Sequence, residues 1–266
     1  MQPQLDTLIS AAATAQRPAL VILRHSTPEA QAAEHLGVFP AAFAPPTFAH
    51  IALIQRAQRQ ARLDAVLLLL NLRNADKGDM RRDLQHSVAM LELLCRRVTW
   101  LGLGLSSHPY FLDMLEALRD ASVQGRVSFL VGFDTLVRIL DPEGRYLGHY
   151  ATPRASRAEA LAALFSTASA LVAGRAQRSA RDLHDLLVEQ GAAAWQASIS
   201  YLPMPKGLHG VSSSLVRERV RGMAGIEDLV PRSIAAYIAT HRLYEGRGRG
   251  PSRGASGSYP APVEEA

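Results

Sequence analysis

The chain of 266 residues has a single cysteine, Cys95, and no long hydrophobic run. One cysteine excludes an intramolecular disulfide, and without a Cys-x-x-Cys pair a structural zinc site is not expected. The apolar run at residues 65–70 is far shorter than the ~20 residues that span a membrane. The first residues lack the basic and apolar parts of a signal peptide, so we expect a cytoplasmic protein with no membrane partner.

Basic residues outnumber acidic ones, with 29 Lys and Arg against 24 Asp and Glu, which gives a net charge of +5. A basic balance suits a polyanionic nucleotide ligand, and it also suits contact with nucleic acid. Part of the excess lies in residues 245–266, which are rich in Gly, Pro and Ser. We expect this tail to be disordered, because such a composition cannot bury a core.

Apolar runs and helical periodicities alternate along the chain. Apolar runs predict strands at residues 19–23, 37–39, 64–70, 98–105, 127–131, 170–173 and 197–202. Helical spacing predicts helices at residues 5–15, 28–36, 48–61, 81–97, 109–119, 158–168 and 180–189, and residues 71–80 are predicted to be a polar loop. This alternation predicts an α/β fold with a Rossmann-like, doubly wound parallel sheet and helices on both faces.

Residues 37–50 combine a strand, a proline-rich turn and a helix start. Pro45 and Pro46 force an extended turn, because proline fixes its own φ and biases the residue before it away from helix. Thr47 and His50 stand where the helix begins. The free N–H groups and the dipole at a helix N-terminus attract anions, phosphate above all. The Thr47 hydroxyl can also cap the helix.

Residues 211–217, Val-Ser-Ser-Ser-Leu-Val-Arg, predict a second strand-to-helix junction. Arg217 lies one turn into the helix, on the same face as Ser213 and Ser214. Hydroxyls and a guanidinium at a helix start suit phosphate. Taken alone, the stretch is more typical of a capped helix with a solvated arginine, and only its pairing with residues 37–50 favours a phosphate site.

Together, the two stretches resemble the nicotinamide/nicotinate mononucleotide adenylyltransferases. Their superfamily of nucleotidyltransferases is marked by a Gly-x-Phe-x-Pro-x-(His/Thr)-x-Gly-His loop and an Ile-Ser-Ser-Thr-x-x-Arg loop. The resemblance implies a nucleotidyltransferase domain at residues 36–244, between an N-terminal extension at residues 1–35 and the tail at residues 245–266. We expect the extension to supply an extra edge strand covered by a helix, or a contact between subunits.

The resemblance implies that ATP is joined to a pyridine mononucleotide, which gives NAD or its deamido form and pyrophosphate. Mg²⁺ would be bound through the ATP phosphates, and no protein metal ligands are expected. Small-molecule nucleotides would be the partners, nucleic acid is not expected, and homo-oligomerisation stays open. Whether the acceptor base is the amide or the acid also stays open.

By resemblance, His50 donates to the ATP phosphates as charge moves to pyrophosphate. The catalytic set implied by the resemblance is His50, Thr47 and Arg217 from the two motifs, together with Lys77 from the predicted polar loop. A solvated loop lysine is an almost equally good interpretation of Lys77. The residues implied to bind the nucleotides are Phe43, Ser212, Ser213, Ser214, Gly132, Asp134 and Arg175. Trp100 and Trp195 could stack on the pyridine ring, although a core position is the simpler interpretation of both.

The loop departs from the family pattern in ways that leave alternatives open. Ala41 and Ala49 stand where glycine is usual, Ala44 replaces Asn or Asp, and Ser87 stands where the family often has an arginine. One alternative is a transferase of the same superfamily with another acceptor, of the cytidylyl or pantetheine-phosphate type. The other is a non-catalytic relative that binds nucleotides or RNA.

Overall fold

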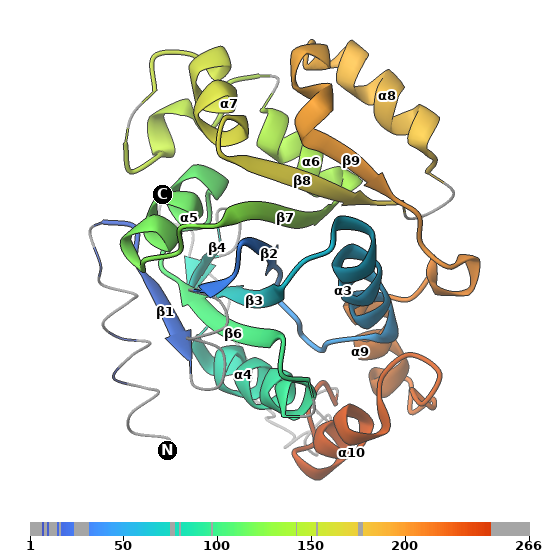
Figure 1. The fold of residues 1–266 in the computed structure, drawn as a ribbon. Helices are drawn as coiled ribbons and strands as arrows, with labels where there is room; N and C mark the ends of the chain where they lie inside the picture. The colour runs from blue at the N-terminus through green and yellow to red at the C-terminus, as the bar shows by residue number, and fades with distance from the viewer. Residues whose placement is uncertain are drawn as a thin grey trace, which may run out of the picture.

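The computed structural model describes residues 7, 10, 15, 17–23, 32–74, 78–79, 81–96, 98–141, 143–152, 154–174 and 178–245. Seven strands form one sheet in the order β1-β6-β3-β2-β7-β8-β9 (Figure 1). Their bounds are β1 (Leu20–Leu23), β2 (His35–Pro40), β3 (Ala65–Asn71), β6 (Leu101–Ser106), β7 (Arg126–Gly132), β8 (Ala168–Ala173) and β9 (Ile199–Leu202). All neighbours pair in parallel except β1 and β6, which are antiparallel. The predicted α/β class is therefore confirmed.

Helices follow most of the strands and cover both faces of the sheet (Figure 1). The α-helices are α3 (Phe48–Ala61), α4 (Arg81–Cys95), α5 (Phe111–Asp120), α6 (Phe133–Leu140), α7 (Arg157–Phe165), α8 (Ala180–Glu189), α9 (Ser213–Arg221) and α10 (Arg232–Thr240). Three short 3-10 helices complete the described chain at η1 (Leu147–His149), η2 (Ala193–Ser198) and η3 (Lys206–Leu208).

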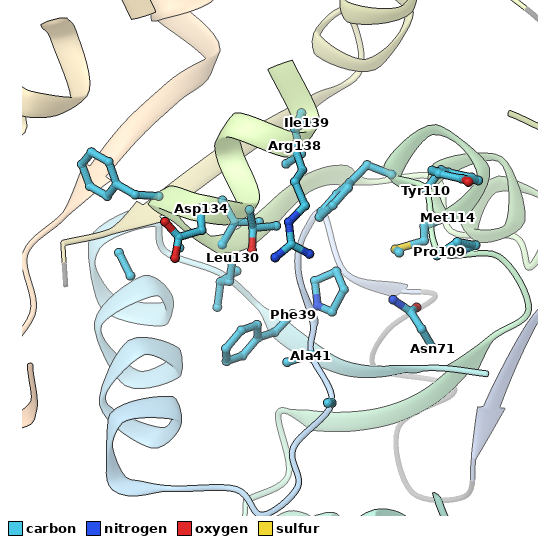
Figure 2. A pocket seen from close by; sticks show the side chains of 18 of the residues that line it. Phe39, Ala41, Asn71, Pro109, Tyr110, Met114, Leu130, Asp134, Arg138 and Ile139 are labelled. Atoms are coloured by element: carbon cyan, nitrogen blue, oxygen red, sulfur yellow. The ribbon is translucent and has the colours of Figure 1, made fainter. Parts of the chain in front are cut away.

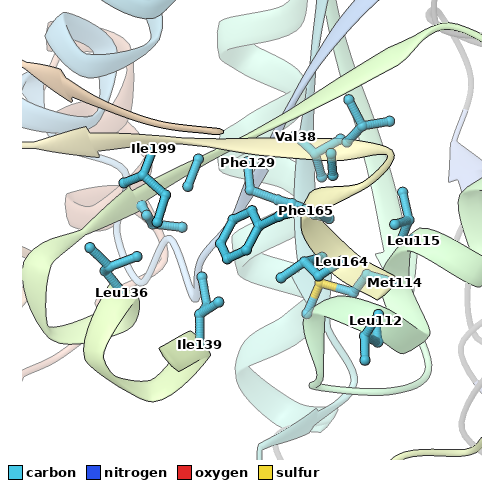
Figure 3. Packing of buried hydrophobic residues seen from close by; sticks show 14 of the residues in the cluster. Val38, Leu112, Met114, Leu115, Phe129, Leu136, Ile139, Leu164, Phe165 and Ile199 are labelled. Carbon is cyan, nitrogen blue, oxygen red and sulfur yellow. The ribbon is translucent and has the colours of Figure 1, made fainter. Parts of the chain in front are cut away.

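The leucine-rich strand β3 is buried on both faces. Ala65, Leu67 and Leu69 pack into one hydrophobic cluster with residues of α5, α6 and α7. Leu68 and Leu70 face the opposite way, into a second cluster with residues of α3 and α4. Because successive side chains of a strand alternate between faces, only a continuous apolar run can fill both layers. Figure 3 shows the first cluster, with Phe129 and Phe165 among leucines from the covering helices.

The chain winds outward from β2 in two directions. It runs first through β3 to β6 and then returns to the other side of β2 through β7, β8 and β9. The strand order therefore reverses between β2 and β7, and ligands of such sheets bind where the order reverses. The strand expected from residues 19–23 is present as edge strand β1.

Several sequence predictions of local structure are wrong. Residues 71–80 are not only loop, because β4 (Arg73–Asn74) and β5 (Gly78–Asp79) pair there as a small antiparallel ladder. His35 and Leu36 were predicted to end a helix but begin β2, where they pair with β7. Residues 28–31 and most of the predicted helix at residues 5–15 lie outside the described residues.

Two further corrections concern elements near the predicted motifs. Strand β7 runs directly into α6, a helix that the sequence did not predict, with Gly132 as its N-cap. The predicted strand before α9 is absent from the described chain, because β9 ends at Leu202 and η3 follows it. No helix of the described residues is long and apolar enough to cross a membrane.

Leu68 provides a test of the two-sided core. Replacing this fully buried side chain with alanine should lower the free energy of unfolding by about 2–5 kcal/mol, because a cavity is left in a packed layer. Urea unfolding followed by circular dichroism measures the loss. Val188→Ala is the control, since the Val188 side chain is largely exposed and its truncation should change stability little. Equal losses for the two variants would contradict the described core.

Candidate active site

A cavity of about 620 Å³ opens at the carboxyl ends of the parallel strands (Figure 2). Its lining includes the last residues of four strands, Pro40, Asn71, Gly132 and Ala173. The cavity thus lies where the strand order reverses, which is the position expected for a ligand site in this architecture.

His50 lines this cavity from the first turn of α3. The backbone N–H of Thr47 donates to Nδ1 of His50 at 3.0 Å, and the Thr47 hydroxyl lies 2.8 Å from the same nitrogen. Because a backbone N–H can only donate, Nδ1 must accept, and the proton of the neutral ring is then on Nε2. Thr47 is completely buried. It therefore orients the imidazole, and His50 carries the N–H donor.

Phe43 lies beneath the histidine rather than in the cavity wall. Its side chain is buried, and its ring lies 5.1 Å from Phe39 and 5.2 Å from His50, measured between centroids. The backbone of Phe43 has a φ of 45°, which is an uncommon conformation for a residue with a side chain. The loop thus turns sharply at Phe43, and the ring packs under His50.

The second predicted motif packs against the first. Ser213 Oγ donates to the carbonyl of Pro45 at 2.8 Å, and Arg217 Nη1 donates to the carbonyl of Ala44 at 2.6 Å. Arg217 Nη2 also donates to Ser214 Oγ at 3.0 Å. These bonds connect the start of α9 to the loop before α3, so the structure brings together two motifs from opposite halves of the chain.

Ser212 has a local role in the same motif. Its hydroxyl accepts a hydrogen bond from the backbone N–H of Leu215 at 3.2 Å and caps α9. Neither Ser212 nor the other α9 residues named above line the cavity itself. The motif thus borders the site from behind the loop.

Gly132 and Asp134 both line the cavity at the start of α6. The carboxylate of Asp134 is exposed and reaches into the cavity (Figure 2). A Cβ added at Gly132 would meet no other atom within 4 Å. A side chain there would consequently project into open space rather than into the core.

Two arginines of the cavity were not predicted from the sequence. Arg138 follows Asp134 by one turn of α6 and points into the cavity (Figure 2). Arg178 also lines the cavity, with its guanidinium carbon 5.8 Å above the ring of Phe133. Guanidinium groups suit phosphate oxygens. Had α6 been predicted, the i, i+4 spacing of Asp134 and Arg138 would have indicated that both side chains lie on one face of that helix.

An aromatic wall closes another side of the cavity. Tyr110 lies 5.7 Å from Tyr146 and 5.5 Å from Tyr150 between ring centroids, and all three line the cavity. Burial raises the pKa of Tyr150 to about 12, so its phenol is neutral at physiological pH. Trp100 and Trp195 pack against the hydrophobic clusters instead. The tyrosines, not the tryptophans, therefore offer faces for a planar ring.

Asn71 adds a polar group that the sequence reasoning missed. Its side-chain oxygen is buried and, among the described residues, has no hydrogen-bond partner. Asn71 lines the cavity close to Pro109 and Tyr110 (Figure 2). A buried acceptor without a donor costs free energy.

Three further positions named from the sequence are Lys77, Arg175 and Ser87. Lys77 and Arg175 lie outside the described residues. Ser87 is buried and lines the cavity where the resembled family often has an arginine. The cations of the described cavity wall thus come from α6 and from the segment before α8.

The described residues contain no group of three or more His, Cys, Asp or Glu side chains arranged to hold a metal ion. Mg²⁺ is often bound through one or two carboxylates together with substrate phosphates rather than in an all-protein cage. The exposed carboxylate of Asp134 fits that arrangement.

No protein-family model matches the chain. The chain is 25% identical over 224 residues to a Dehalococcoides mccartyi protein named "Probable nicotinate-nucleotide adenylyltransferase", an alignment that covers 78% of this chain and 96% of that protein. A Schizosaccharomyces pombe protein named "Putative nicotinamide mononucleotide adenylyltransferase" is 31% identical over 106 residues, which is 39% of this chain and 41% of that protein.

The fold is similar to that of a solved adenylyltransferase. The structure of the Plasmodium falciparum nicotinic acid mononucleotide adenylyltransferase complexed with NaAD superposes with a TM-score of 0.56, at 14% sequence identity, over 79% of this chain and 97% of that chain. The expected Rossmann-like fold and the resemblance to these adenylyltransferases are therefore confirmed.

Gly132→Leu tests whether the cavity binds nucleotide. The added side chain should fill open space and weaken ATP binding by at least about tenfold, because it occupies ligand volume. The melting temperature should stay close to that of the wild type, since the φ of Gly132 is −92° and any residue can adopt it. Isothermal titration calorimetry and thermal unfolding measure the two effects. A fall in stability without a change in affinity would contradict this view of Gly132.

Asp113 gives the protein a pH-dependent stability. Burial raises the pKa of this carboxyl from 3.8 to about 6, so the folded state favours the protonated form. Its stabilising contribution is complete below about pH 4 and is lost as the pH rises through about 6. The amide of the Asp113→Asn variant does not titrate. We therefore expect the melting temperature of the wild type to fall, relative to that of this variant, between these pH values. Parallel profiles would refute the assignment.

Proposed function

We propose that this nucleotidyltransferase-type enzyme, an adenylyltransferase by its similarity to curated relatives, joins ATP to nicotinamide or nicotinate mononucleotide. The mononucleotide phosphate attacks the α-phosphorus of ATP, a new P–O bond forms, and the bond to the β-phosphate oxygen breaks as pyrophosphate leaves. Such a reaction requires in-line positioning and stabilisation of charge on phosphate oxygens, and no covalent intermediate with the protein.

The observation that carries the proposal is the fixed tautomer of His50 in the cavity. The Thr47 bond to Nδ1 leaves Nε2 as the donor nitrogen, at the N-terminal turn of α3. A neutral donor at a helix N-terminus can stabilise charge that develops on the leaving pyrophosphate. Arg138 and Arg178 add positive charge to the same cavity, which supports a ligand with several phosphates.

The α9 motif would contribute to the ATP site from behind the loop. Arg217 uses one hydrogen of Nη1 and one of Nη2 for the bonds to Ala44 and Ser214. A guanidinium has five N–H donors, so further donors remain for phosphate oxygens. We assign Ser212, Ser213 and Ser214 to the same phosphate-binding region, and Lys77 and Arg175 remain predicted phosphate contacts.

The tyrosine wall is the proposed site of the acceptor's pyridine ring. Tyr110, Tyr146 and Tyr150 offer aromatic faces, and stacking on such faces favours planar heteroaromatic rings. Asp134 would meet Mg²⁺ that is bound through the ATP phosphates, where the cation neutralises phosphate charge.

Pyrophosphate release tests the reaction directly. The purified protein is assayed with ATP and Mg²⁺ in the presence of nicotinamide mononucleotide, nicotinate mononucleotide, or no acceptor. We expect release that depends on the acceptor, and the preferred acceptor identifies the substrate. Release with CTP or with a pantetheine phosphate instead would favour the other acceptors of the superfamily. ATP binding without release on any acceptor would favour a non-catalytic relative.

His50→Ala tests the central residue of the proposal. Loss of a preorganised donor to the transition state should lower kcat by about 100- to 1,000-fold. Circular dichroism should report an intact fold, because the imidazole lines the cavity and meets the core only at its border, through the rings of Phe39 and Phe43. His184→Ala is the matched control, since His184 is exposed on α8. An unchanged rate in His50→Ala would rule out the proposed role.

A further inference from the structure

A short segment after α6 carries two of the three wall tyrosines. We call residues 143–152 the tyrosine strap, because they contain Tyr146 and Tyr150. Asp141 fastens its first part, since its carboxylate accepts the N–H groups of Arg145 at 2.8 Å and of Tyr146 at 2.9 Å. The last part of the strap is fastened by a residue from a different helix.

That residue is Asp113 of α5. Its Oδ1 accepts the backbone N–H of Ala151 at 3.0 Å across 38 residues of sequence. Asp113 is only 1% exposed, and its Oδ2 has no hydrogen-bond partner among the described residues. Burying a carboxylate costs free energy that an apolar side chain at the same position would not. Packing in the core alone therefore does not explain an aspartate at this position. Among the described residues, the hydrogen bond that the Asp113 carboxylate accepts comes from the backbone N–H of Ala151 in the strap.

Asp113 also lies next to the third tyrosine. Tyr110 is the N-cap residue of α5, three positions before Asp113. The aromatic wall therefore has one member on the α5 start and two on the strap. The Asp113–Ala151 hydrogen bond is a direct link between these two parts of the wall. If the bond is lost, the end of the strap keeps only the exposed hydrogen bond from the Thr152 hydroxyl to Glu116 of α5 at 3.2 Å, among the hydrogen bonds of the described residues. The separation of Tyr110 from the other two rings is then held less firmly from this side.

We propose that Asp113 is a positioning residue that sets the spacing of the tyrosine wall for the planar ring of the acceptor nucleotide. The inference rests on the proposed function, because it assigns the wall to the acceptor. Asp113 itself does not touch the ligand, and it acts through Ala151 and the strap. The strap bonds named above go to Asp141 and α5, not to α3 or α9, where we assign the ATP phosphates. Affinity for the acceptor should therefore depend on Asp113, and affinity for ATP should not.

Three full-length variants separate this role from a general loss of stability. Asp113→Ala removes the acceptor of the Ala151 hydrogen bond. Asp113→Asn keeps an oxygen that can accept the same bond. Arg145→Gln is the control on the strap itself, because the Arg145 side chain is 69% exposed and pairs only with the exposed Glu143 among the described acidic residues.

The first measurement is hydrogen exchange of the strap amides by mass spectrometry. In Asp113→Ala, exchange of residues 143–152 should rise by about fivefold or more, because a backbone hydrogen bond that limits local opening is lost. Exchange in β3 and β7 should stay at the wild-type rate, which shows that the fold is intact. Asp113→Asn and Arg145→Gln should match the wild type throughout.

The second measurement is steady-state kinetics with the acceptor and ATP varied separately. In Asp113→Ala, the KM for the mononucleotide should rise by about three- to tenfold, as expected for a weakened stacking contact. The KM for ATP should remain within about twofold, because its proposed contacts lie on other elements. Asp113→Asn should restore the wild-type KM for the mononucleotide.

Equal rises in both KM values, or an Asn variant that behaves like the Ala variant, would overturn the positioning role. So would unchanged strap exchange in Asp113→Ala, even in an active enzyme. A wild-type protein that turns over neither mononucleotide would instead overturn the proposed function, while the exchange result would still decide whether Asp113 anchors the strap.

Discussion

The hydrogen bonds from Ser213 and Arg217 to the carbonyls of Pro45 and Ala44 are the interaction on which the candidate site depends. Backbone carbonyls in a proline-rich turn have no strand or helix partner of their own, and a donor is needed to satisfy them when they are removed from water. The donors come from α9, so a helix in the second half of the chain fixes a turn in the first half. The turn then fixes Thr47, and Thr47 fixes the tautomer of His50.

The packing of the central sheet also holds the candidate site in place. Because β3 is buried on both faces by separate clusters, the carboxyl ends of the central strands are held in one place. Asn71 is the last residue of β3, Asp134 comes two residues after β7, and His50 stands in the first turn of the helix that follows β2. Two alanines stand where the resembled family usually has glycine, and the structure accommodates both. Ala49 is buried in α3, where a methyl group is tolerated, and Ala41 forms part of the cavity lining.

Much of the fold could be predicted from the sequence, because the alternation of apolar runs and helical periods is a local signal. Helix α8 was predicted with its observed ends, and the leucine run predicted β3. Helix α6 was missed because it follows β7 without an intervening turn, so Phe133 and Asp134 looked like the end of the strand. The small ladder of β4 and β5 was missed because two-residue strands carry no periodicity.

The residues of the candidate site also fall into those that the sequence could predict and those that it could not. Thr47 and His50 could be found because they belong to a motif, and their mutual hydrogen bonds follow from their spacing at a helix start. Arg138, Tyr146 and Asn71 could not, because only the folded chain brings their separate segments to one cavity. Nor could the sequence reveal that Phe43 packs beneath the histidine, since that depends on a backbone turn with positive φ.

Edge strand β1 has a consequence for how the protein behaves in solution. It pairs antiparallel with β6, and Ala19 and Ser107 exchange further hydrogen bonds just beyond the strands. Without β1, the apolar strand β6 would present a row of unpaired backbone donors and acceptors, which is a template for pairing with another chain. The N-terminal segment thus replaces the six-residue edge of β6 with the four-residue edge of β1, and a shorter edge strand is a poorer template for pairing with another chain.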